Sequence, residues 1–170
     1  MKPKTESTNK DAQSVRGREN KYLTFTLANE DYGIGILKIK EIIGMMKITP
    51  VPRTPAFIKG VINLRGKVIP VTDLRLRFGM PETSYTERTC IIVVEIESQT
   101  GLLLMGIVVD SVSEVLSIKS ESIDAAPSLG AKVDASYILG MAKTEGGVKI
   151  LLDIDRILNE DEIAELESSS

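Results

Sequence analysis

The stretch GVINLRGKVIPVTDL, residues 60–74, carries the pattern that decides the fold. Apolar side chains alternate with other residues on both sides of a central pair, Arg65 and Gly66, and a period of two is typical of half-buried strands. A glycine in a short connection between two such runs is typical of a tight hairpin turn. The sequence therefore predicts a β-hairpin, followed by a short helical turn that Asp73 caps.

Outside this hairpin, the chain consists of short β-rich runs separated by Gly, Pro and Asp. No segment between the runs has a long apolar stripe of helical period, which argues against βαβ units and favours barrels or sandwiches. We therefore expect a mainly β protein with short helices, the second of them within residues 153–167. Residues 1–20 are polar and charged and are expected to form a disordered tail, and residues 159–170 a short acidic helix or tail.

The sequence contains an internal duplication in two blocks, each aligned without a gap. In the first block, GIGILKIKEII, residues 33–43, matches GIVVDSVSEVL, residues 106–116. In the second block, the hairpin stretch matches GMAKTEGGVKILLDI, residues 140–154. Because both blocks recur in the same order, we expect two similar small β-barrels, with a boundary near residues 80–88.

The composition excludes several classes of function. The chain has no histidine, which removes the commonest general base, the commonest zinc ligand and every catalytic triad built on histidine. Its single cysteine, Cys90, cannot form an internal disulfide and therefore fits a reducing compartment. The sequence shows no signal peptide, and no apolar run is long enough to span a bilayer. We therefore expect a soluble, cytoplasmic protein that is not an enzyme and holds no metal.

The charge of Arg65 must reach water, a carboxylate or a partner protein, because a guanidinium is protonated at every accessible pH. Two interpretations stay open: Arg65 is a solvated charge on a turn, or it forms an ion pair and contacts a partner protein. Glu41 is its natural mate, since a small barrel can bring the strand of Glu41 beside the hairpin. Such a pair at a shallow groove would hold the guanidinium in place and add little net stability.

A β-barrel binding module of another class, such as a nucleic-acid binder, is the alternative function. Lys59, Arg65 and Lys67 form a basic hairpin that could touch phosphates. The formal net charge of −3 and the aromatic content of 4% argue against it, because bases would find few side chains on which to stack. An apolar groove that binds another protein therefore fits the chain better.

Four stretches of the sequence carry a resemblance to a known family: YGIGILKIKEI, the long motif TPAFIKGVINLRGKVIPVTDLRLRFG, GIVVDSVSEVL and ILLDIDRIL. They are similar to the CheW-type chemotaxis coupling proteins. The resemblance implies a CheW-like domain over residues 21–158, in which two five-stranded SH3-like β-barrels form intertwined halves, 21–82 and 88–158. It also implies a non-catalytic adaptor in a two-component signalling system. This adaptor would couple the regulatory domain of the histidine kinase CheA to the cytoplasmic tips of chemoreceptors, the methyl-accepting chemotaxis proteins.

The resemblance further implies roles for individual residues. Five positions match the family's receptor-facing strand and its G-x-x-N-L-R-G segment and are expected to bind the receptor: Ile39, Glu41, Gly60, Asn63 and Arg65. Two positions are expected to contact the kinase: Val115 and Leu129. No cofactor, no nucleic acid and no direct membrane insertion is expected, so the protein would join receptor arrays only through its partners.

Overall fold

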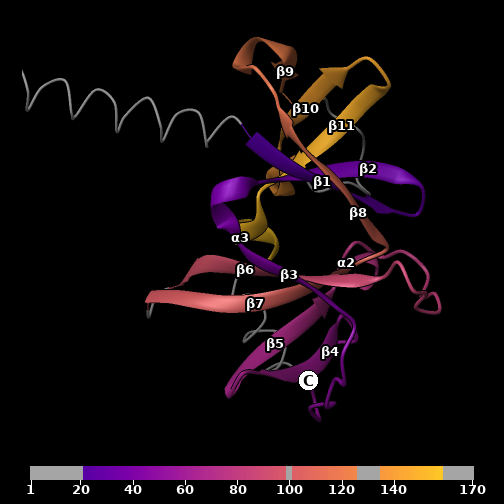
Figure 1. Cartoon of the computed structure of the whole chain (residues 1–170), viewed down its shortest axis with the longest axis vertical. Helices are drawn as coiled ribbons and strands as arrows, with labels where there is room; N and C mark the ends of the chain where they lie inside the picture. The colour runs from indigo at the N-terminus through magenta and orange to yellow at the C-terminus, as the bar shows by residue number, and fades with distance from the viewer. Residues whose placement is uncertain (1–20, 99–100, 126–134, 159–170) are drawn as a thin grey trace, which may run out of the picture.

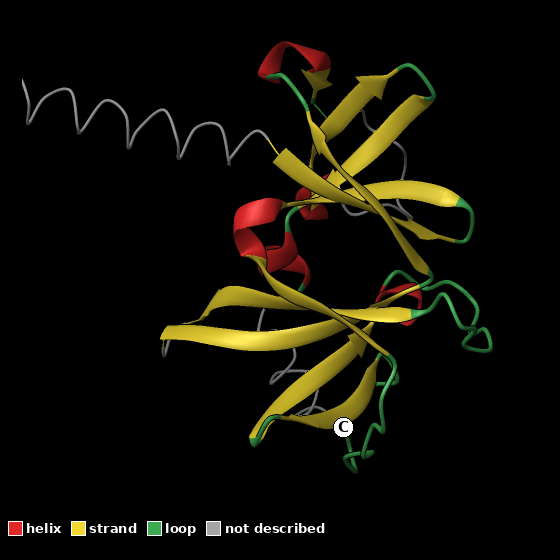
Figure 2. Cartoon of the chain, viewed as in Figure 1, coloured by secondary structure: helices red, strands yellow, loops and turns green. Residues whose placement is uncertain are grey.

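The computed structural model describes residues 21–98, 101–125 and 135–158. In this part of the chain the strands form two sheets joined by short helical turns and loops (Figure 2). The predicted mainly β class and the pairing of two small β units are confirmed, and closure of each sheet into a barrel stays a prediction. The two predicted terminal segments, 1–20 and 159–170, lie outside the described residues.

The five-stranded sheet has the order β3-β6-β7-β5-β4 (Figure 1). Its strands are β3 (Ile39–Gly44), β4 (Ile58–Leu64), β5 (Lys67–Asp73), β6 (Cys90–Ser98) and β7 (Gly101–Val109). The six-stranded sheet has the order β8-β1-β2-β11-β10-β9. Its strands are β1 (Lys21–Leu27), β2 (Glu30–Gly35), β8 (Ser111–Ser117), β9 (Ile123–Asp124), β10 (Ile138–Thr144) and β11 (Gly147–Leu152). The helical turns are η1 (Ile36–Lys38), α2 (Leu74–Arg77), η2 (Ser120–Ser122), η3 (Ala135–Tyr137) and α3 (Ile154–Ile157).

The two sheets share one topology, as the duplication predicts. The order β3-β6-β7-β5-β4 corresponds strand by strand to β8-β1-β2-β11-β10. The parallel pairs fall at equivalent residues, because Val71 pairs with Gly106 and Leu151 pairs with Gly33. The two glycines match each other in the first duplicated block, and Val71 matches Leu151 in the second. At each glycine a Cβ atom would lie less than 3 Å from a neighbouring side chain, so close packing explains why both positions are glycine.

Each sheet takes strands from both halves of the sequence. β1 and β2 precede residues 80–88 but pair with β8 and β11, and β3 pairs with β6 beyond that segment. A chain that exchanges strands in this way cannot be cut at residues 80–88 into two separate sheets. The limits 21–82 and 88–158 therefore describe halves of the sequence and do not describe separate sheets. The exact position of these limits stays a prediction.

The main apolar core lies between the two sheets, where α3 is also seen (Figure 1). Its buried members are Leu23, Phe25, Leu27, Tyr32 and Ile34 from β1 and β2; Ile92, Val94, Ile96, Met105, Ile107 and Val109 from β6 and β7; Leu152 from β11; and Leu74, Ile154, Ile157 and Leu158 from the helical segments. A second core belongs to the five-stranded sheet alone and contains Ile62, Ile69, Val71, Ile91, Val93 and Val108. The shared core joins the two sheets into one folded unit, since each sheet buries its apolar face against the other.

The predicted hairpin turn and helix caps are present. Arg65 and Gly66 occupy the turn with φ angles of 51° and 89°, and the Asn63 side chain accepts a hydrogen bond from the Gly66 amide at 2.8 Å. Asp73 accepts from the amide of Leu76 at 3.3 Å and so caps α2. The second hairpin turn differs, because there the positive φ falls on Gly147, at 128°, one residue beyond the glycine expected in the turn.

Candidate functional site

An ion pair between Glu41 and Arg65 spans a groove on the five-stranded sheet. Glu41 lies on β3 and Arg65 in the β4–β5 turn, and β3 and β4 are the two outer strands of the sheet. We call this the first groove; it encloses about 510 Å³ and is also lined by Lys40, Leu64, Lys67, Ile69, Val93, Glu95 and Leu104. The structure thus places Arg65 beside Glu41, the mate expected for it from the sequence.

The Glu41–Arg65 ion pair contributes little to the stability of the fold and leaves the guanidinium accessible to solvent. The Arg65 side chain is 70% exposed and that of Glu41 32% exposed. An ion pair this accessible to water contributes about 0.2–1 kcal/mol to folding. A guanidinium has five N–H donors in a planar fork, so a single carboxylate leaves donors directed to the outside. Arg65 is therefore oriented by Glu41 and open to a further partner.

A second cation of the hairpin, Lys59, is also engaged with an acid. Lys59 donates to Glu82 at 2.8 Å and lies 5.8 Å from the centre of the Tyr85 ring. The hydrogen bond from Lys59 lowers the pKa of the Glu82 carboxyl. Lys40, beside the hairpin on β3, lies 3.5 Å from Glu95. Two of the three hairpin cations, Lys59 and Arg65, therefore pair with acids, which argues against a basic patch of the kind that follows a phosphate backbone.

The remaining predicted receptor residues have structural roles in the hairpin and its sheet. Ile39 packs against the main core and pairs with Val94. Gly60 has a φ of 142°, and a Cβ atom there would lie 2.1 Å from the carbonyl oxygen of Thr49. Asn63 closes the turn through its side-chain oxygen. Of the five predicted residues, Glu41 and Arg65 are the two that line the first groove.

The predicted kinase-facing position Val115 lies on β8 and is 50% exposed. Its counterpart in the first duplicated block is Ile42 on β3, which is 45% exposed. The two sheets thus present an apolar side chain at the same place on their outer strands. Leu129, the second predicted kinase contact, lies outside the described residues.

Other exposed apolar side chains were not singled out by the sequence. Val68 and Val148 match each other in the second duplicated block and are 70% and 56% exposed. Leu102 and Leu139 are 67% and 57% exposed. The alternation in strands predicts that one face is buried, but it gives no reason for an apolar residue on the other face. The one sequence signal for these exposed apolar positions was the valine that recurs at matching places in the two hairpins.

Two acidic residues outside the first groove, Asp153 and Asp155, serve the fold. The Asp153 side chain caps α3, and Asp155 lies 2.6 Å from Lys38 and accepts from the amide of Glu97 at 3.0 Å. Among the described residues, no group of three or more His, Cys, Asp or Glu side chains is arranged to hold a metal ion. Burial raises the pKa of the Cys90 thiol, which disfavours the nucleophilic thiolate.

These features define a class of protein: a doubled β fold with an ion-paired groove and exposed apolar side chains on its surface. In the part of the chain that the structure describes, no helix has the length and apolar character needed to cross a membrane. The family model of the CheW-like domain matches residues 21–162. The chain therefore belongs to the CheW-like domain family.

Individual relatives agree with this assignment. The chain is 43% identical to the chemotaxis protein CheW of Klebsiella aerogenes over 143 residues, which cover 84% of each chain. It is 32% identical to CheW of Rhizobium meliloti over 86% of its own length and 90% of the relative. Among solved structures, the scaffolding protein TtCheW from Thermoanaerobacter tengcongensis matches with a TM-score of 0.73 at 38% identity, covering 83% of this chain and 88% of that one.

Proposed function

We propose that this protein is the adaptor that couples a histidine kinase of the CheA type to chemoreceptors. The family membership makes the chain a non-catalytic chemotaxis coupling protein, because its relatives are named as chemotaxis proteins and as a scaffolding protein. The alternative of a nucleic-acid binder is not supported, since the basic side chains Lys59 and Arg65 of the hairpin pair with acids. Association with membrane receptor arrays is part of the proposal.

The observation that carries the proposal is the exposed Arg65 held by Glu41 across the first groove. We assign this groove to the tip of the receptor, with Ile39, Gly60 and Asn63 as residues that support its shape. We assign the surface around Val115 on β8 to the regulatory domain of the kinase, and Leu129 to the same contact. The two surfaces lie on different sheets, which would allow both partners to bind at once.

Arg65→Glu tests this assignment. The change places two carboxylates together and presents the wrong sign to the receptor, which costs about 1–3 kcal/mol of binding through lost charge-assisted hydrogen bonds and repulsion. Binding to a chemoreceptor cytoplasmic fragment, measured by calorimetry, should weaken about tenfold or more. Binding to the regulatory domain of the kinase should change by less than about twofold.

Arg88→Glu is the matched control, because Arg88 is exposed, lies outside the first groove and undergoes the same change of charge. It should leave both affinities close to those of the wild type. If Arg65→Glu weakens both partners equally, the assignment to two surfaces is wrong. If the wild-type protein binds neither partner, the adaptor function itself is wrong.

A further inference from the structure

The β4–β5 hairpin has an apolar face that the described residues do not build into a core. Directly paired residues of two strands share one face of the sheet, and the pair Ile62–Ile69 lies in the second core. The opposite face, which we call the outer face of the hairpin, carries the pairs Ile58–Thr72, Val61–Pro70 and Asn63–Val68. Val68 is 70% exposed, and neither it nor Ile58 nor Val61 belongs to a hydrophobic cluster of the described residues.

The chain leaves the main core next to this outer face. Among the described residues, the main core contains side chains of β6 and β7 but none of β4 or β5. In Figure 1 the six-stranded sheet and α3 lie on the side of β6 and β7, whereas β5 and β4 extend away from them. Leu158, the residue before the segment 159–170, is buried in the main core, and the carbonyl of Ile157 accepts a hydrogen bond from Arg77 at 3.0 Å. Because Arg77 belongs to α2, which directly follows β5, the chain reaches residue 158 beside the outer face.

The segment 159–170 and the region of the hairpin carry opposite charges. Residues 50–77 contain six Lys or Arg and a single acid, Asp73, whereas residues 159–170 contain five acids and no base. Arg53 and Lys67 are exposed and have no ion pair within the part of the chain that the structure describes. The segment also contains Ile163 and Leu166, which are three positions apart and would share one face of a helix. Its charge and its apolar side chains are thus both complementary to the hairpin region.

We propose that the segment 159–170 binds along the outer face of the β4–β5 hairpin of its own chain. Ile163 and Leu166 pack against Val61 and Val68, and the acids face the basic residues around the hairpin. As a helix the segment would be about 18 Å long, and neighbouring strands lie about 4.8 Å apart, so it can cross both β5 and β4. The segment then braces the hairpin that carries Arg65. This inference goes beyond the adaptor role and does not depend on it.

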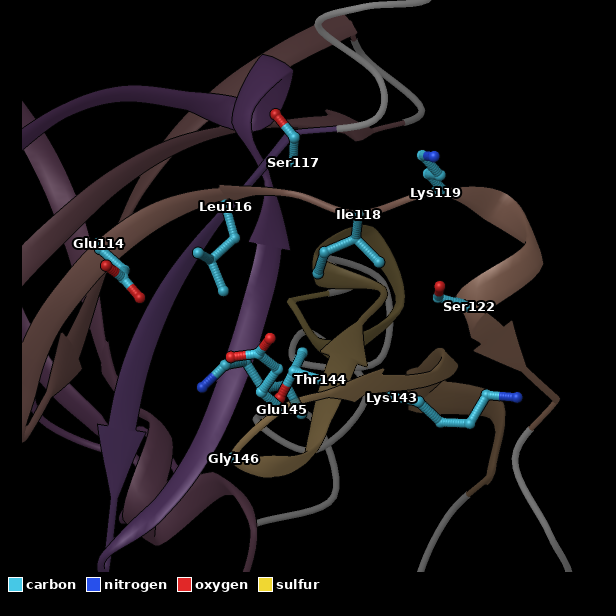
Figure 3. A pocket seen from close by; sticks show the side chains of 11 residues that line it. Glu114, Leu116, Ser117, Ile118, Lys119, Ser122, Lys143, Thr144, Glu145 and Gly146 are labelled. Atoms are coloured by element: carbon cyan, nitrogen blue, oxygen red, sulfur yellow. The ribbon is translucent and has the colours of Figure 1, made fainter.

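The corresponding hairpin of the six-stranded sheet offers a competing place. The duplication matches β10–β11 to β4–β5 and Val148 to Val68. A pocket of about 640 Å³ lies between this hairpin and β8 (Figure 3). Its charged walls are Lys119, Lys143 and Lys149 together with Glu114 and Glu145. Lys143 lies 3.4 Å from Asp124, and Lys149 lies 2.9 Å from Asp31. With its cations balanced by acids in this way, the pocket suits an acidic segment less well than the β4–β5 region does.

A nitroxide label at the end of the segment tests the proposal without any partner protein. The label is attached to Ser169→Cys in the full chain, with Cys90 replaced by alanine. Amide-correlation NMR spectra should show paramagnetic broadening of the signals of Val61 and Val68 and none at Val148. The same label at Ser7→Cys, in the other terminal segment, should leave Val68 sharp. Labelled protein mixed with isotope-enriched protein that carries no nitroxide should show no broadening, since the contact lies within one chain.

Two matched substitutions complete the test. Val68→Asp places a charge that repels the acids on the outer face and should abolish most of the broadening at Val61. Val148→Asp makes the same change at the matching, 56% exposed position of the other hairpin and should leave that broadening unchanged.

Four results would each overturn the proposal. They are broadening at Val148 in place of Val68, broadening at neither hairpin, broadening of Val68 from Ser7 or from a second copy alone, and equal effects of the two substitutions. The pattern in the protein without these substitutions decides the matter even if a variant folds poorly.

Discussion

Substitution of Gly60 by alanine should destabilise the five-stranded sheet. Gly60 belongs to the motif that the family resemblance connects with the receptor, but its surroundings in the structure are those of a packing residue. Its φ of 142° is a conformation that L side chains rarely adopt, and an added Cβ atom would lie 2.1 Å from the oxygen and 2.7 Å from the carbonyl carbon of Thr49. Both atoms belong to the backbone, so no rotation of a side chain can relieve the clash.

The size of the effect follows from the contacts that must shift. Thr49 and Val61 exchange two backbone hydrogen bonds, of 2.8 and 2.9 Å, next to Gly60. Each bond contributes about 0.5–1.5 kcal/mol to stability. An alanine forced into a glycine-only region of φ costs roughly 1–3 kcal/mol more. The total of about 2–6 kcal/mol is a large share of the stability of a domain, which is about 5–15 kcal/mol.

Urea denaturation measures this loss directly, with Gly44→Ala as the control. Gly44 lies on β3 without a positive φ, and an added Cβ atom there would meet nothing within 4 Å. Gly60→Ala should lower the free energy of unfolding by about 2–6 kcal/mol and Gly44→Ala by less than about 1 kcal/mol. The affinity of the folded fraction for the receptor should stay the same in both variants. Equal stability of the two variants, or a loss of receptor affinity in a fully folded Gly60→Ala protein, would refute the packing argument.

Two further predictions concern side chains that join the elements around α2. Burial, followed by the nearby charge of Asp73 and a hydrogen bond of 3.0 Å to it, raises the pKa of Tyr85, so the unfolded chain should lose this proton first and stability should fall as the pH rises above about 10. Urea denaturation at pH 8 and pH 10.5 should show a smaller fall in Tyr85→Phe, and an identical fall would exclude the role of this phenol. Arg75, whose pKa is raised by its 2.9 Å hydrogen bond to Asp110, joins α2 to the end of β7, and Arg75→Ala should cost about 1–3 kcal/mol in the same assay. Arg88→Ala, at an exposed arginine, should cost less than about 0.5 kcal/mol, and equal losses in the two variants would show that the Asp110 contact contributes nothing.

The sequence predicted the local elements well because the signals for them are local. The period of two in residues 60–74 indicated the hairpin, and Asp73 indicated the cap of α2. The duplication predicted the shared topology, and both glycines that open the first block, Gly33 and Gly106, lie at the same parallel pairing. The pairing of Arg65 with Glu41 was also predicted as one of two interpretations, since a small barrel can bring the strand of Glu41 beside the hairpin.

The exchange of strands between the sheets could not be predicted from these signals. Periodicity identifies strands, and repetition identifies equivalent strands, but neither says whether a strand pairs within its own half or with the other half. The choice depends on the core between the sheets, where Phe25 and Ile107, from opposite halves of the sequence, belong to one buried cluster. The exposure of Val68 was missed for a similar reason, because the pattern of a strand does not show which face is covered.

The backbone conformation of Arg65 separates what the motif does for the fold from what it does for binding. A φ of 51° suits glycine or asparagine, and for any other L residue it costs about 1–2 kcal/mol. The ion pair with Glu41 contributes less than about 1 kcal/mol, because the Arg65 side chain is 70% exposed. An arginine at this position therefore lowers the stability of the hairpin, whereas Gly60 and Asn63 in the same motif maintain it. A residue that costs stability and points its donors outward is best explained by a partner that uses them, and this is why Arg65→Glu should change binding while Gly60→Ala changes folding.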